Sequence, residues 1–199
     1  MSTLQQASIV AATRTPIGQA PRGVLSHQRP DDLLARVIQG VLVHAPSLDP
    51  AAIEDAIVGC AIPEGPQGLN VARIGALLSG LPSSVGGVTV NRFCASGLTA
   101  IAMAADRIRV GEADVLIAGG TESMSQVPTM GVSTSFSPAI FARDENLGIA
   151  YGMGLTAEQV AVRWKVSRED QDAFALRSHQ RAIAAQQAGE FADEMLPLD

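Results

Sequence analysis

Short apolar runs alternate with amphipathic helical segments along the first 120 residues of this chain. The apolar runs have the length and composition of buried strands, and they span residues 7–12, 56–60, 85–92 and 114–120. Between them, apolar residues at three- and four-residue spacing predict helices over residues 31–43, 70–79 and 96–110. Because strand–helix alternation implies right-handed crossovers and a mainly parallel sheet, the pattern predicts an α/β fold.

The alternation stops after residue 120. Residues 121–150 have no sustained periodicity and are rich in Ser, Thr, Pro and Gly. A stretch of that length inside a compact chain is typical of a functional loop or a disordered segment. We therefore divide the chain into an α/β region over residues 1–120 and a second region over residues 121–199.

Helices are predicted again near the end of the chain. Thr156 and Gln159 have the spacing of a capping box and precede one helical segment. Ser167 with Asp170 predicts the start of a long Ala-rich helix that ends near Gly189. No strand is predicted after these helices.

Composition and charge narrow the function classes. Of the 199 residues 47% are hydrophobic but only 4% aromatic, which favours an aliphatic core and a parallel sheet covered by helices. The net charge of −6 argues against nucleic acid as a partner. No run approaches the ~20 apolar residues of a membrane span, and the first residues lack the plan of a signal peptide. We expect a soluble, cytoplasmic protein with no membrane partner.

Two cysteines are too few for a disulfide framework and lack the spacing of a zinc site. Cys94 is the stronger candidate for chemistry, in residues 90–98, which read VNRFCASGL where a strand passes into a helix. The N–H groups and positive dipole end of that helix favour thiolate over thiol. A lone cysteine is more often a small buried hydrophobe, but the small residues Ser96-Gly97 suit the tight turn of a nucleophile elbow. On this geometry alone, packing and chemistry both remain open.

The other candidates favour structural roles. Cys60 ends a strand without a following helix start, which predicts a buried, inert thiol. Residues 152–157 (GMGLTA) only superficially fit a dinucleotide-phosphate motif, because no strand precedes them. His27, His44 and His179 are isolated in the sequence, so we expect exposed or structural roles and no metal site.

Several segments together resemble the thiolase family, the 3-ketoacyl-CoA thiolases and acetyl-CoA acetyltransferases. The resemblance covers nearly the whole chain in the expected order, at residues 14–18 (RTPIG), 91–98 (NRFCASGL), 118–125 (AGGTESMS), 153–158 (MGLTAE) and 167–175 (SREDQDAFA).

The resemblance implies that Cys94 attacks the 3-keto carbonyl of a 3-ketoacyl-CoA and holds the acyl group as a thioester, which coenzyme A then removes. The Cys94 N–H would stabilise the thioester oxyanion. Coenzyme A is a substrate, so no cofactor is expected, and the full-length protein is expected to be a homo-oligomer. Residues from 121 onward would form the family's helical loop domain over the acyl chain and pantetheine, with Met153 lining that pocket.

The chain also departs from the family. Short-chain biosynthetic members carry a histidine where this chain has Gly152, which favours a degradative enzyme with broader acyl-chain tolerance. Family members are about twice as long, and their second half supplies an activating histidine and a second cysteine. We therefore expect an amino-terminal, truncated portion of a thiolase, with the other half on a continuation or on a separate chain. The alternatives are a non-catalytic CoA- or acyl-binding or assembly module, and a ketoacyl-synthase-type condensing enzyme.

Overall fold

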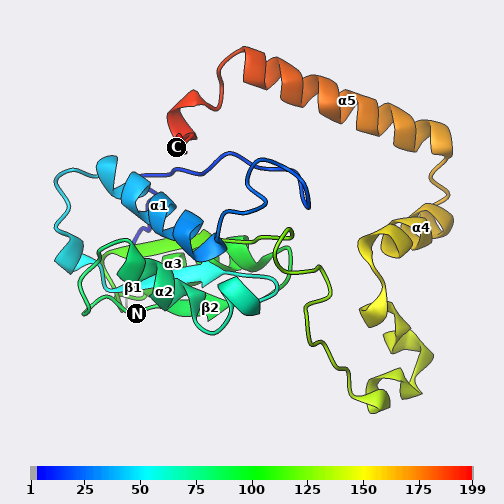
Figure 1. The fold of residues 1–199 in the computed structure, drawn as a ribbon, viewed down its shortest axis with the longest axis horizontal. Coiled ribbons are helices and arrows are strands. Elements are labelled where there is room, and N and C mark those ends of the chain that lie inside the picture. The colour runs from blue at the N-terminus through cyan, green and yellow to red at the C-terminus, as the bar shows by residue number, and fades with distance from the viewer. Residues whose placement is uncertain (1–3, 199) are drawn as a thin grey trace. The chain divides into compact units, whose positions relative to one another are not determined.

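The computed structural model describes residues 4–198 and divides the chain into two units (Figure 1). Unit 1 contains the residues up to Ser133 together with those from Glu194 onward. Unit 2 contains Thr134–Asp193. Each unit is described below by itself.

Unit 1 is built on a parallel sheet of three strands, β1 (Asp55–Gly59), β2 (Val88–Val90) and β3 (Leu116–Gly120). The order is β2-β1-β3, so β1 is the central strand. Gly59 of β1 lies opposite Val90 of β2 and Gly120 of β3, so the carboxyl ends of all three strands meet at one edge. In parallel α/β sheets this is the edge where ligands bind.

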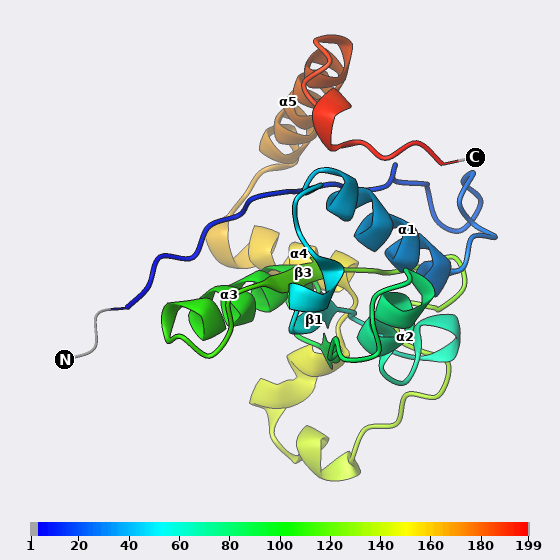
Figure 2. The same ribbon diagram turned by 90° about the vertical axis from the view of Figure 1, so that its left-hand side faces the viewer.

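Helices cover both faces of the sheet (Figure 2). On one face α1 (Pro30–Val43) and α2 (Val71–Leu78) bury the larger apolar cluster, which includes Leu34, Ile38, Ala56, Val58, Cys60, Val71, Ala76 and Val85. On the other face α3 (Ser96–Arg109) packs Ala100 and Ala104 against Ile57. The α/β fold predicted from the sequence is confirmed, with small residues on α3 allowing that helix to approach the sheet closely.

The helix boundaries follow local sequence signals. Pro30 occupies the first turn of α1. The Asn70 side chain caps α2 by accepting a hydrogen bond from the Arg73 N–H at 3.3 Å. Gly111, with φ +76°, follows the end of α3, where a left-handed residue is needed. The predicted helices are confirmed to within one or two residues.

The strand prediction for residues 7–12 is wrong. This segment forms no strand, and Ile9 and Val10 are 77% and 84% exposed. An apolar run predicts burial, but a strand also needs a neighbouring strand as its hydrogen-bonding partner. Among the described residues, no strand pairs with residues 7–12. β2 and β3, at the sheet edges, are also shorter than the runs 85–92 and 114–120.

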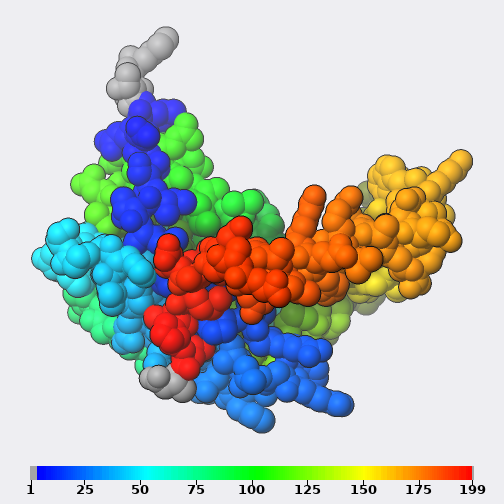
Figure 3. Space-filling view, turned by 90° about the horizontal axis from the view of Figure 1, so that it is seen from above, coloured from blue at the N-terminus to red at the C-terminus, as the bar shows by residue number. Residues whose placement is uncertain are grey.

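Just after this segment, Arg14 forms a single parallel bridge with Met195. The Arg14 N–H donates to Glu194 O, and the Leu196 N–H donates to Arg14 O, both at 2.8 Å. Figure 3 shows the end of the chain, in red, against the amino-terminal segment, in blue. The chain therefore returns to unit 1 after its last helix, although not as a strand of the sheet.

Unit 2 contains α4 (Met153–Trp164) and α5 (Arg168–Gln187), and neither helix has a buried residue. The Ser167 hydroxyl accepts the Asp170 N–H at 3.1 Å, as predicted for the start of α5. The capping box at Thr156 is wrong, because α4 begins at Met153 and the Thr156 hydroxyl donates back to Gly152 O at 3.3 Å.

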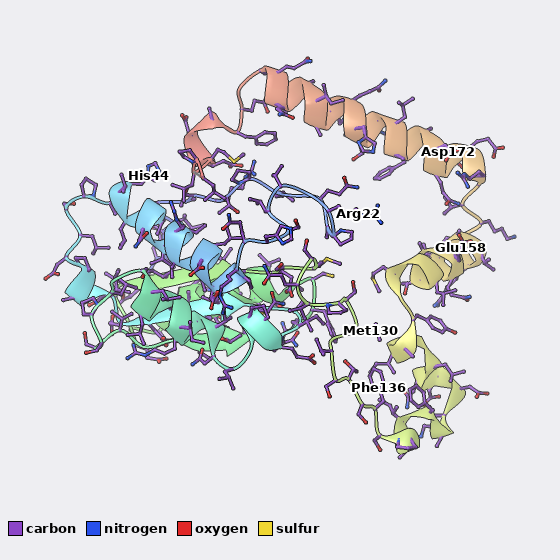
Figure 4. The ribbon with its side chains drawn as sticks, in the orientation of Figure 1. Arg22, His44, Met130, Phe136, Glu158 and Asp172 are labelled. Carbon is purple, nitrogen blue, oxygen red and sulfur yellow. The ribbon has the colours of Figure 1, made fainter. Side chains whose placement is uncertain are left out.

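Irregular chain and short 3₁₀ turns make up most of the rest. Met130 lies at the end of unit 1 and Phe136 near the start of unit 2 (Figure 4). The turns are Pro50–Ala52, Gly65–Gln67, Pro138–Ala142, Asp144–Ala150 and Ala192–Glu194.

Across residues 4–198, no helix combines the length and the apolar character needed to cross a bilayer.

Candidate active site at the carboxyl edge of the sheet

Cys94 lies in the turn that joins β2 to α3, and its side chain is exposed. Phe93, immediately before it, has φ +47°, in the left-handed region that bulky residues rarely adopt. Ala95 is the N-cap residue of α3, so Cys94 immediately precedes the N-terminus of that helix. This is the sharp strand-to-helix turn that the sequence predicted.

The turn is held by its own side chains. Ser96, only 3% exposed, donates its hydroxyl to Phe93 O at 2.6 Å and accepts the Arg92 N–H at 2.8 Å. The Asn91 side chain accepts the Phe93 N–H at 2.8 Å. These bonds hold Phe93 in its strained conformation, and strain that the surroundings enforce is typical of functional sites.

Glycines let α3 rest directly on the end of the sheet. A Cβ on Gly59 would lie 2.5 Å from the Ser96 carbonyl carbon and 2.6 Å from the Gly97 nitrogen. A Cβ on Gly120 would lie 3.2 Å from the Gly59 oxygen. The N-terminus of α3, and with it the Cys94 turn, is therefore seated on the ends of β1 and β3.

Three backbone N–H groups at and just after Cys94 are unpaired within the described residues. Among residues 4–198, the N–H groups of Cys94, Gly97 and Leu98 donate to no backbone or side-chain acceptor. Unpaired N–H groups at a helix N-terminus bind anions and stabilise oxygen atoms that gain negative charge. The arrangement can hold a thiol nucleophile beside an oxyanion.

Among residues 4–198, no basic side chain is hydrogen-bonded to the thiol. Within the described residues the Cys94 sulfur makes no hydrogen bond to any side chain. His27 lies in the loop before α1, His44 follows α1 and His179 lies in α5 of unit 2; all three are exposed, as predicted. Met153 begins α4 in unit 2 and is 65% exposed. Its predicted role in an acyl pocket stays a prediction.

A polar cluster that the sequence pattern does not indicate lies beside β1. Gln67, fully buried, donates its amide to Ile62 O at 2.8 Å and to the Glu122 carboxylate, and accepts the Ser123 N–H at 2.8 Å. The other oxygen of Glu122 accepts the Ala61 N–H at 2.6 Å. The available signal was the position of Glu122, a charged residue two places after the apolar strand β3.

Cys60 borders this cluster and is buried, as predicted, at 1% exposure. Its sulfur donates to Gln67 O at 3.9 Å. Burial, together with the nearby negative charge of Glu122, raises the pKa of the Cys60 thiol to about 12. Cys60 is therefore a protonated, inert thiol at neutral pH.

The two thiols should be separable by alkylation. We expect iodoacetamide at pH 8 to modify Cys94 in the folded chain and to leave Cys60 unmodified until denaturant is added, because only the thiolate reacts. Peptide mass mapping at increasing times would measure both rates. Equal, slow modification of the two cysteines would contradict the exposed, reactive placement of Cys94.

The comparisons with known proteins agree with one another. The family model described as "Thiolase, N-terminal domain" matches residues 7–199. A 3-ketoacyl-CoA thiolase of Bacillus subtilis is 49% identical over 196 residues, which are 98% of this chain and 49% of the relative. A beta-ketoadipyl-CoA thiolase of Escherichia coli is 46% identical over 209 residues, covering 98% of this chain and 52% of the relative. The chain spans about half the length of the curated relatives it matches.

Proposed function

This chain belongs to the thiolase family, and from that premise we propose that Cys94 is the acyl-accepting nucleophile of a 3-ketoacyl-CoA thiolase site. The observation that carries the proposal is the Cys94 turn itself. An exposed thiol stands at a strained strand-to-helix turn, with unpaired N–H groups at the start of the following helix. Enzymes that form covalent acyl intermediates need this combination of nucleophile and oxyanion donors.

The proposed reaction has two halves. The Cys94 thiolate attacks the C3 carbonyl of a 3-ketoacyl-CoA, and the Cys94 N–H donates to the oxygen that becomes negative. The C2–C3 bond then breaks, its electron pair remains on C2, and a proton there completes acetyl-CoA. The acyl thioester left on Cys94 is attacked by the thiol of coenzyme A, which regenerates the cysteine and releases the shortened acyl-CoA. The reverse sequence is a condensation.

Finer assignments rest on the family resemblance. Unit 2 would act as the helical loop domain that covers the acyl chain and pantetheine, with Met153 lining the pocket. Its two helices have no buried residue, so their apolar side chains are available to a ligand or to further protein. Gly152, where short-chain members have histidine, supports a degradative preference. The proposed assembly is a homo-oligomer, working in the cytoplasm, where Cys94 stays reduced.

An acyl-transfer experiment tests the proposal. We expect incubation of the chain with acetoacetyl-CoA to add one acetyl group, and peptide mapping should place it on Cys94. Cys94→Ser should accept no stable thioester, whereas Cys60→Ser should be acylated like the wild type. An unmodified wild-type chain that still binds CoA thioesters would instead favour a non-catalytic binding module. Acylation only by a carrier-protein thioester would favour a ketoacyl-synthase-type enzyme.

A further inference from the structure

The Glu122 carboxylate joins two segments that leave the sheet at the edge where Cys94 lies. One of its oxygens accepts the Ala61 N–H, just after β1, and the other accepts the Gln67 amide. Glu122 itself lies just after β3. The Thr121 N–H also donates to Gly59 O at 3.0 Å, which adds a backbone bond between the same two strand ends.

Both donors of the Gln67 side-chain amide and its acceptor oxygen are paired. Its two amide protons go to Ile62 O and Glu122, and its oxygen accepts the Ser123 N–H. A buried amide group whose donors and acceptor are all paired favours one arrangement, because any displacement leaves a buried polar atom without a partner. The two Glu122 carboxylate oxygens are the acceptors for the Ala61 N–H and the Gln67 amide.

A chain of close contacts leads from this network to the nucleophile. Gly59 and Cys60 immediately precede Ala61, and the Cys60 N–H donates to Val90 O at 3.0 Å. The backbone of Gly59 lies against Ser96 so closely that no Cβ would fit between them. Ser96 in turn holds Arg92 and Phe93 in the Cys94 turn.

We propose that Glu122 is a positioning residue for acyl transfer: by holding the ends of β1 and β3 together it keeps the Ser96 support, and with it the Cys94 thiol, in register. This inference rests on the proposed function of Cys94. Glu122 takes no proton and touches no reacting atom. Its two oxygens accept hydrogen bonds from Ala61 and Gln67, and within residues 4–198 it makes none to the Cys94 sulfur.

Glu122→Gln tests the proposal. The glutamine amide would set a donor against either the Ala61 N–H or the Gln67 amide, so one of the two bonds is lost. We expect the maximal rate of Cys94 acylation by acetoacetyl-CoA to fall about tenfold or more, because small displacements of a nucleophile slow its reaction strongly. The half-saturating concentration and the fraction of chains finally acylated should not change. Loss of folding would instead lower that fraction.

Glu112→Gln is the matched control. Glu112 is likewise a paired carboxylate, here bound to Arg107, but it follows the other end of α3. Cys94 of the Glu112→Gln variant should be acylated at the wild-type rate. Glu122→Asp, which keeps the charge but shortens the side chain, should give an intermediate rate, and it replaces Glu122→Gln if that variant does not fold.

Amide hydrogen exchange separates this inference from the proposed function. In Glu122→Gln the Arg92 and Ser96 amides should exchange faster, and in Glu112→Gln they should not. Wild-type acylation rates in Glu122→Gln would overturn the positioning role and leave the nucleophile intact. A wild-type chain that is never acylated would overturn the proposed function. In that case unchanged Arg92 and Ser96 exchange in Glu122→Gln would overturn the positioning role as well, and faster exchange would support it.

Discussion

The purified 199-residue chain is expected to accept an acyl group on Cys94 and then to turn over only very slowly. General acid–base catalysis contributes about 10²–10⁴-fold to reactions of this kind. Among residues 4–198 no side chain lies within hydrogen-bond reach of the Cys94 sulfur, and the three histidines are exposed on other elements. Without a base, neither Cys94 nor the incoming thiol of coenzyme A is deprotonated efficiently.

Steady-state thiolysis of acetoacetyl-CoA measures this effect. We expect a rate about 10²–10⁴-fold below that of the Bacillus subtilis 3-ketoacyl-CoA thiolase assayed in parallel. Mixing the chain with the carboxyl-terminal half of that relative provides the complementary test. A rise in rate on mixing would support a base supplied from that half, and robust thiolysis by the chain alone would contradict the prediction.

Among glycine-to-alanine changes at the carboxyl edge of the sheet, we expect Gly59→Ala to lower the free energy of unfolding most. The new Cβ would lie within 2.6 Å of the Ser96 carbonyl carbon and of the Gly97 nitrogen, so α3 would have to move off the sheet. Overpacking of this kind costs about 1–3 kcal/mol in the free energy of unfolding. Displacement of Ser96 would also slow the acylation of Cys94. Urea denaturation and the acylation rate measure the two effects.

Gly97→Ala is the matched control, because Gly97 lies in α3 at the same contact with Gly59. A Cβ on Gly97 meets no atom within 4 Å, and alanine stabilises a helix relative to glycine by roughly 0.5–1 kcal/mol. This variant should be as stable as the wild type or more so. If Gly59→Ala were equally stable, the close seating of α3 on β1 would be wrong.

The local elements could be predicted well from the sequence. Apolar periodicity placed α1, α2 and α3, and Ser167 with Asp170 placed the start of α5, because both signals act between residues within a few turns. The segment at residues 7–12 could not be predicted in the same way. Its apolar pattern is that of a buried strand, but burial depends on a partner that no local signal identifies.

The same distinction between local and distant contacts holds for the candidate site. The sequence by itself determined the strand-to-helix turn at Cys94, the buried state of Cys60 and, by resemblance, the thiolase family, because each depends on neighbouring residues. Only the tertiary structure brought Glu122 and Gln67 together and seated α3 on Gly59. The Gln67–Glu122 contact joins residues 55 positions apart, and its existence, like that of the Gly59–Ser96 contact, depends on strand order and packing distances.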